Sequence, residues 1–199
     1  FNTTRILTTA FLNWNIIKGL NFRSNLGVTN GNSRNGFFTG ANSLERSLST
    51  GSLSRVSNTT GLDITWENIL TYQKDFGKHN IGATVLTSYV KGTEDNSSAS
   101  GTGQLLPGQS FYALQNNPAN LAISSRYVSS TLLSGAFRLN YNYAGKYLLT
   151  ITGRSDGSSV FSEENKWQFF PSVAAAWRIS DEAFMQNSKI LSDLKLRAS

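Results

Sequence analysis

The sequence has no cysteine, a single histidine and no long apolar run in its 199 residues. Without cysteine, a disulfide-stapled secreted scaffold and a thiolate metal site are both excluded. His79 has no second histidine with which to complete a typical transition-metal site, and its place beside a tight turn predicts a solvated turn residue. The densest apolar patch, 173–177, ends at Arg178, whereas a membrane-spanning helix needs about 18 apolar residues. These absences argue against a helical membrane protein, and we expect neither a metal nor another cofactor.

Positive charge exceeds negative charge, with 18 Lys and Arg against 12 Asp and Glu. The basic side chains are scattered singly, however, and no basic run is present. A nucleic-acid-binding face needs clustered Lys and Arg. We therefore interpret the net charge of +6 as a solvated surface and expect no nucleic-acid partner.

The chain also lacks a catalytic constellation. Acidic residues are adjacent at 163–164 and at 181–182, but the two members of such a pair point to different faces of a strand. Loop solubility and helix capping therefore explain these residues better than a catalytic dyad. The glycine-rich stretches 101–103 and 156–159 have neither the strand-to-helix setting nor the lysine of a phosphate-binding loop. Serine and threonine are plentiful, but they have no plausible histidine partner for a hydrolase triad. We predict that the protein is not an enzyme.

What the sequence does have is a period-two alternation of apolar and polar residues, which is typical of strands with one oily and one polar face. In the clearest stretch, 133–143, the odd-numbered residues are mainly apolar and the even-numbered ones mainly polar. The pattern recurs at 147–156, 62–73 and 168–180, with weaker copies at roughly 5–16, 20–30 and 80–92. Strands of about 10 to 15 residues exceed the roughly 5 to 6 typical of soluble sandwiches. Aromatic rings near the ends of the oily faces suit a membrane interface.

The connections between these strands alternate in length. Tight turns are expected near 18–19, 77–78 and 144–146, and long Ser/Gly/Asn-rich segments at about 31–58, 94–130 and 157–166. A transmembrane barrel has short periplasmic turns and long extracellular loops. We therefore predict an all-β, antiparallel transmembrane β-barrel segment, a meander of about seven strands and the start of an eighth, with the long segments on one edge. Residues 180–192 are interpreted as a longer periplasmic turn that starts with a short helix, and 107–117 as another brief helix.

The parity of the oily faces fixes the register of one hairpin. Odd-numbered residues point outward in both 133–143 and 147–153, so the turn between them must hold an odd number of residues. A three-residue turn at 144–146 follows. We predict three opposed pairs: Tyr143 with Tyr147, Leu139 with Ile151 and Arg138 with Thr152.

Residues 153–185 resemble a barrel segment of the SusC/RagA family of TonB-linked outer-membrane proteins. The resemblance rests on motifs in this order: Asp156-Gly157-Ser158-Ser159, Asn165, Trp167, Phe169-Phe170-Pro171-Ser172 and Trp177-Arg178. Residues 191–199 are similar to the family's next strand, and 1–152 match it in style only. Val160 stands where the family more often has a basic residue.

The resemblance implies a barrel of about 22 strands with an N-terminal plug, in the Gram-negative outer membrane. Residues 1–199 would then be part of a TonB-dependent receptor barrel domain, with the plug and the rest of the barrel outside this chain. The implied function is import of oligosaccharides or peptides. The implied partners are a SusD-like surface lipoprotein, TonB through a segment not in this chain, the ligand and outer-membrane lipid.

For ligand contact we single out three residues of the second long loop, Phe111, Tyr112 and Gln115, because aromatic rings with nearby amides suit sugar faces and edges. Packing of the loop on itself is the alternative. Two other functions also fit parts of the pattern: a passive porin or adhesin barrel, and a soluble carbohydrate-binding sandwich whose oily faces a second sheet would cover. Because strand edges and the oily face would be uncovered, we expect residues 1–199 alone to aggregate in water.

Overall fold

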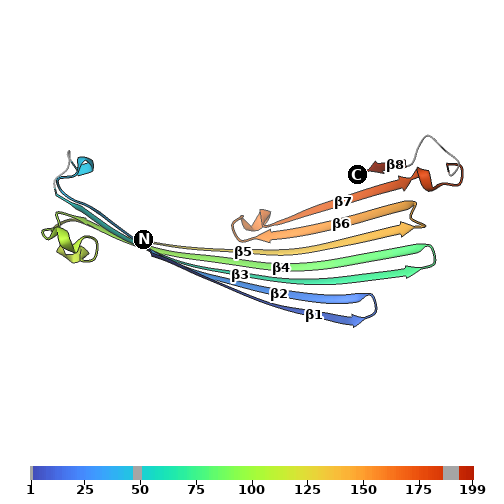
Figure 1. Ribbon diagram of the computed structural model, residues 1–199, viewed down its shortest axis with the longest axis horizontal. Helices are drawn as coiled ribbons and strands as arrows, with labels where there is room; N and C mark the ends of the chain where they lie inside the picture. The colour runs from blue at the N-terminus through green and yellow to red at the C-terminus, as the bar shows by residue number, and fades with distance from the viewer. Residues whose placement is uncertain (1, 47–50, 186–192) are drawn as a thin grey trace. The chain divides into compact units, whose positions relative to one another are not determined.

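Eight strands form one sheet in which neighbours in sequence are neighbours in space (Figure 1). The computed structural model describes residues 2–46, 51–185 and 193–199. The strands are β1 (Asn2–Ile17), β2 (Leu20–Thr39), β3 (Leu53–Phe76), β4 (His79–Thr102), β5 (Ala119–Tyr143), β6 (Tyr147–Ser158), β7 (Trp167–Arg178) and β8 (Lys195–Ala198). The predicted antiparallel meander of seven strands and a short eighth is confirmed. Among the described residues, no helix has the length and apolar character that a membrane crossing requires.

The chain divides into two compact units. Unit 1 consists of Phe1–Thr8, Gly27–Ile64 and Lys91–Ser130, and unit 2 of Thr9–Leu26, Thr65–Val90 and Thr131–Ser199. The connections after β2 and β4 belong to unit 1, and the tight turns belong to unit 2 with β6 to β8. Each unit is described by itself below.

The strands β2 to β5 are longer than the alternation predicted. They contain 20, 24, 24 and 25 residues, whereas about 9 to 11 suffice to cross a bilayer at a tilt. The predicted loops at 31–58 and 94–130 were wrong in extent, because these strands occupy much of both ranges. The physical reason is that polar side chains pair across the strands there, as Asn96 Nδ2 donates to Thr59 Oγ1 at 2.7 Å. Such strands need no oily face, so hydrophobic alternation does not reveal them.

The remaining connections follow the prediction more closely. The third long segment lies between Ser158 at the end of β6 and Trp167 at the start of β7, and it follows an even-numbered strand, as the connections after β2 and β4 do. Two separate 3-10 turns, η2 (Pro107–Gln109) and η3 (Leu114–Asn116), replace the single brief helix. A 3-10 turn, η5 (Ile179–Asp181), opens the connection after β7. The short helix expected to carry 183–185 was wrong, because these residues form a turn. The rest of the predicted periplasmic turn, 186–192, lies outside the described residues.

The hairpin of β5 and β6 has the predicted register. Tyr143 pairs with Tyr147, and Leu139 with Ile151. Arg138 pairs with Thr152. The turn holds three residues, 144–146, because an odd number is needed to keep the oily side chains of both strands on one face.

Each tight turn is bonded to the next hairpin through the backbone carbonyl of its last residue. The carbonyl of Gly19 accepts from Gln73 N at 2.7 Å. The carbonyl of Lys78 accepts from Ala144 N at 2.6 Å, and that of Lys146 from Arg178 N at 2.8 Å. Successive hairpins of unit 2 are therefore joined at their turns as well as along their strands.

Aromatic rings of neighbouring strands pack over two glycines of β6. Gly153 pairs with Phe137, and a β-carbon on Gly153 would overlap the Phe137 ring. Gly157 pairs with Trp167, and a β-carbon there would lie 2.7 Å from the indole. Both glycines are buried under these rings. Bare backbone in the strand thus lets large rings lie flat on the sheet.

The sheet has almost no apolar core of its own. Among the described residues, Val56 is the only buried apolar side chain, at 7% exposed. By contrast, Leu133 and Phe137 on the oily face of unit 2 are each 46% exposed. The oily face must therefore be covered by something outside this chain, which is what a bilayer supplies to a barrel wall.

Candidate functional site

A row of aromatic rings crosses unit 2 beside the tight turns. It runs through Phe76, His79, Tyr143, Tyr147 and Trp177, with successive ring centroids 5.7, 4.9, 6.2 and 6.3 Å apart. The last three residues are direct backbone partners, so strand register sets the row. We call these five residues the aromatic row. Its position at the strand ends is that of an interfacial belt, where amphipathic rings meet headgroups and water.

His79 is a member of this row and is not the solvated turn residue that the sequence predicted. Its Nδ1 lies 2.7 Å from the Tyr141 hydroxyl, and its ring contacts those of Phe76 and Tyr143. The prediction was wrong because the cross-strand neighbours of His79 come from β5, more than 60 residues away in sequence. In the described part of the chain, no group of His, Cys, Asp and Glu side chains is arranged to hold a metal ion.

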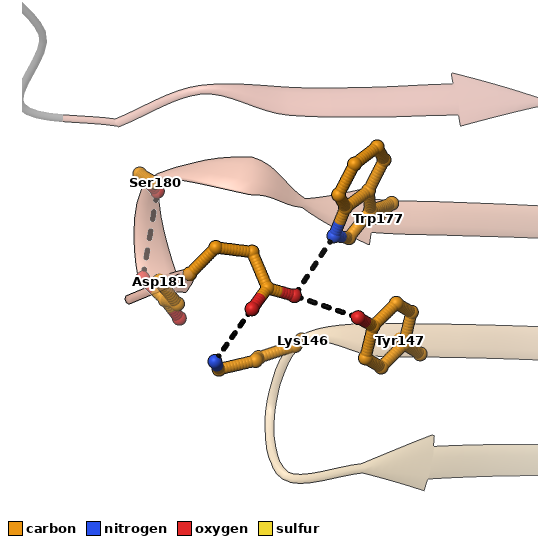
Figure 2. Close-up of polar contacts among 6 residues, drawn as sticks. Lys146, Tyr147, Trp177, Ser180 and Asp181 are labelled. Carbon is orange, nitrogen blue, oxygen red and sulfur yellow. Dashed lines mark hydrogen bonds and ion pairs between the residues drawn. The ribbon is translucent and has the colours of Figure 1, made fainter. Parts of the chain in front are cut away.

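Glu182 gathers three side-chain donors beside the aromatic row. Its carboxylate accepts from Lys146 Nζ at 2.9 Å, from the Tyr147 hydroxyl at 2.7 Å and from Trp177 Nε1 at 3.2 Å. Figure 2 shows Lys146, Tyr147 and Trp177 converging from the β5–β6 turn, β6 and β7. We call these four residues the Glu182 clasp. The clasp ties the segment after β7 to the neighbouring hairpin.

The clasp keeps its carboxylate ionised. Hydrogen bonds from Lys146 first, then from Tyr147 and Trp177, lower the pKa of Glu182 to about 2. The hydrogen bond between Lys146 and Glu182 also raises the pKa of Lys146. A carboxyl group with so low a pKa is a poor general acid or base near neutral pH, and its three hydrogen bonds join the segment after β7 to the hairpin of β5 and β6. The sequence interpretation of 181–182 as capping and solubility residues therefore missed Glu182, because its three donors come from other strands.

The face of unit 2 opposite the oily one is lined with polar side chains. Arg154 Nε donates to both carboxylate oxygens of Asp156, at 2.8 and 3.0 Å, and Arg154 reaches Ser134 Oγ at 3.3 Å. Thr150 Oγ1 donates to Asn140 Oδ1 at 3.0 Å on the same face. The side chains on this face therefore form hydrogen bonds with their neighbours on the same face of the sheet. The face is hydrophilic without presenting a catalytic pair.

Unit 1 also has a polar face. Side chains that touch across neighbouring strands lie on one face, and Asn96 bonds Thr59 at 2.7 Å while the Ser98 and Ser124 hydroxyls lie 2.8 Å apart. Strand alternation then adds the other members. We call this surface the polar face of unit 1; on β3 to β5 it carries Ser57, Thr59, Gly61, Asp63, Gly92, Glu94, Asn96, Ser98, Ser124, Arg126 and Ser130, with the apolar Val128 among them.

The loop between β4 and β5, residues 103–118, holds the three predicted ligand residues, and we call it the outer loop. Phe111 packs inward, since a β-carbon on Gly36 would overlap its ring. The Tyr112 ring lies beside that of Phe111 at a tilt of 34°, with centroids 4.4 Å apart, and Tyr112 is 74% exposed. Gln115 is exposed as well. Phe111 is therefore packed against β2, whereas Tyr112 and Gln115 are exposed to solvent.

The outer loop is fixed at the Ser110 carbonyl. Gln104 Nε2 donates to this oxygen at 2.9 Å and Ser54 Oγ at 3.4 Å, while Ser110 itself has a positive φ of 49°. Ser54 lies five residues from Thr59 along β3, so it is on the face opposite the polar face of unit 1. The outer loop therefore packs on that opposite face. This placement depends on long-range contacts that sequence reasoning missed.

Comparison with known proteins gives consistent relatives. No protein-family model matches the chain. It is 43% identical over 147 residues to the TonB-dependent receptor P26 of Formosa agariphila, which covers 73% of this chain and 15% of that protein. It is 36% identical over 188 residues to the TonB-dependent receptor P3 of the same organism, covering 94% of this chain and 18% of the relative. The TonB-dependent receptor SusC of Bacteroides thetaiotaomicron is 40% identical over 121 residues, 59% of this chain and 12% of SusC.

Solved structures agree on the fold. The RagAB peptide transporter superposes with a TM-score of 0.85 at 24% identity, covering 98% of this chain and 22% of that one. The RagAB peptide importer in its open-open state gives 0.82 at 24% identity, covering 98% and 21%. The chain spans less than a fifth of the length of the curated relatives it matches.

Proposed function

Because this chain belongs to the SusC/RagA-like TonB-dependent receptors, which are outer-membrane β-barrel proteins, we propose that the intact protein imports oligosaccharides or peptides. The identity of 43% to a TonB-dependent receptor carries the proposal. Residues 1–199 form part of the barrel domain in this proposal. A plug and the rest of the barrel would come from the intact protein.

The two faces of the sheet in unit 2 differ as the two faces of a barrel wall do, one apolar and one polar. In unit 2 the oily face would meet lipid, and the aromatic row would lie at the short-turn interface. The opposite face, with Arg154, Asp156 and Asn140, would line a hydrated lumen. A ligand moving along such a wall exchanges water for side-chain hydrogen bonds, so no single contact needs to hold it strongly.

The partners belong to the proposal too. Import against a gradient needs an energy source, for which we propose TonB, acting through a segment outside this chain. A SusD-like surface lipoprotein would capture the ligand at the mouth. The relatives are named as receptors, and we accordingly infer that the protein is not an enzyme.

Ligand contact by the outer loop also stays a proposal, now with distinct roles for its residues. Tyr112, at 74% exposed, and the exposed Gln115 would touch ligand before it enters the barrel, since the outer loop packs on the face opposite the polar face of unit 1. Phe111 would act as a positioning residue, since its ring occupies the space over Gly36.

The proposed import can be tested by uptake in the native host. Cells with and without the intact gene would be given fluorescently labelled pools of oligosaccharides and of peptides, each with and without TonB. We expect uptake of one pool that needs both the receptor and TonB. Uptake that persists without TonB would instead identify a passive porin, and adhesion without uptake would identify an adhesin. A soluble sandwich is disfavoured because the described strands form one sheet without a second sheet over it.

A further inference from the structure

A hollow of about 240 Å³ lies in unit 1 where β1, β2 and β3 run side by side. Its lining consists of Thr3, Thr4, Arg5, Thr29, Gly31, Asn32, Ser33, Thr59, Gly61 and Asp63. Thr59, Gly61 and Asp63 belong to the polar face of unit 1. The hollow is smaller than the roughly 300 to 1,000 Å³ of sites that enclose a whole small ligand. It fits one unit of a longer molecule.

The floor of the hollow is backbone without side chains. A β-carbon on Gly31 would have nothing within 4 Å, and one on Gly61 would meet only the Thr93 carbonyl oxygen at 3.8 Å. The rim beside this floor is made of hydroxyls, and Thr3 Oγ1 donates to Ser33 Oγ at 3.3 Å there. Gly31 and Gly61 therefore leave open a space that larger residues would fill.

Two residues of opposite charge, Arg5 and Asp63, line this space. Across the described part of the chain, neither Arg5 nor Asp63 takes part in an ion pair. The Asp63 carboxylate extends over Gly92, where a β-carbon would lie 3.1 Å from its Oδ1 and 3.6 Å from Ser130 Oγ. Gly92 thus leaves room for a carboxylate whose hydrogen-bonding capacity is not used by a basic partner.

The chemistry of the lining selects among polar ligands. It contains no aliphatic or aromatic side chain, whereas extended peptides are recognised through pockets for alternate side chains. Arginine only donates hydrogen bonds, an ionised aspartate only accepts them, and hydroxyls do both. A ligand unit that satisfies all three must carry several groups that donate and accept. Opposite charges at one site also disfavour a ligand of high charge of either sign.

We propose that this hollow binds one sugar unit of a neutral oligosaccharide, with Asp63 accepting and Arg5 donating hydrogen bonds to its hydroxyls. The inference rests on the proposed import function and narrows its ligand. It places the sugar contact on the polar face of unit 1, opposite the face on which the outer loop packs.

The test uses the intact receptor purified in detergent, on an array of neutral oligosaccharides and on a peptide array. We expect binding to neutral glycans. Asp63→Ala or Arg5→Ala should weaken that binding about ten-fold or more, because each removes hydrogen bonds to a charged group. Gly31→Val should weaken it at least as much by filling the floor. Gly135→Val is the matched control, since Gly135 is an equally open strand glycine in unit 2.

Heat-modifiable migration on gels would establish that each variant assembles, and Asp63→Asn offers a variant of nearly unchanged shape. The inference is overturned if the receptor binds only peptides or no array member. It is also overturned if assembled Gly31→Val, Asp63→Ala and Asp63→Asn receptors all bind glycans like the wild type. In each of those cases TonB-dependent uptake would stand or fall on its own experiment, so the two failures are distinguishable.

Discussion

Replacing Gly19 by alanine should loosen the joint between the first two hairpins. Gly19 ends the turn between β1 and β2 with a φ of +84°, in the left-handed region. A β-carbon there would overlap the Gln73 carbonyl oxygen, and Gln73 N donates to the Gly19 carbonyl at 2.7 Å. The substitution therefore strains the turn and pushes it away from β3 as well.

The expected size follows from these two effects. The left-handed conformation costs an alanine roughly 1 to 2 kcal/mol, and loss of the bond between the hairpins adds about 1 kcal/mol. Gly77→Ala is a matched control, because Gly77 has a φ of +61° but nothing within 4 Å of its β-carbon position. That variant should lose only the conformational part. The difference between the two should be at least about 1 kcal/mol.

The comparison can be made on the intact receptor in detergent by urea unfolding, followed by intrinsic fluorescence. We expect both variants to have lower midpoints than the wild type, with Gly19→Ala the lower of the two. Equal midpoints for the two alanine variants would refute the idea that contact between hairpins, and not turn conformation alone, makes glycine necessary at position 19.

Three further outcomes are expected. The folded pKa of Glu182 is lowered to about 2 from an ordinary 4.5, so the clasp's contribution to stability is complete above about pH 4.5 and is lost as pH falls towards 2. Pepsin should therefore cut the segment after β7 faster as the pH falls through this window. Glu182→Ala should abolish that pH dependence, whereas Glu163→Ala, at a side chain 90% exposed, should not. Tyr112→Ala should reduce uptake with the outer loop still resistant to protease, while Phe111→Ala should also make that loop cleavable; unchanged uptake in both would remove the loop from ligand contact. Residues 1–199 produced alone without detergent should elute as aggregate in size-exclusion chromatography, and a monodisperse soluble monomer would contradict the reading of the exposed oily face.

The register of the membrane-facing hairpin was predictable from the sequence because a side-chain period of two leaves few alternatives. Once Leu139 and Ile151 must share the oily face, pairings with an odd sum are excluded, and the short turn at 144–146 selects among the rest. The tight turns at 18–19 and 77–78 were predictable for a related reason, since an apolar alternation stops and restarts around each of them.

The long polar strands and the sites were not predictable in this way. Between Asn96 and Thr59 the stabilising contact is a hydrogen bond across 37 residues of sequence, and neither side chain has a hydrophobic signature. Glu182 is likewise one of several scattered acidic residues until β6 and β7 bring the Tyr147 hydroxyl and the Trp177 indole to it. The period-two apolar pattern detects strands with a face that lipid covers. The polar strands and the Glu182 clasp depend instead on hydrogen bonds between polar side chains, which leave no such pattern.

The backbone bonds at the tight turns have a consequence for motion. Local opening costs least where a segment has few contacts and its backbone hydrogen bonds are exposed to solvent. In unit 2, the carbonyls of Gly19, Lys78 and Lys146 are each held by the following hairpin. A turn can open only if its neighbour yields a bond at the same time, so slow breathing at this end involves several hairpins together. The tight turns of unit 2 should consequently open together and not hairpin by hairpin.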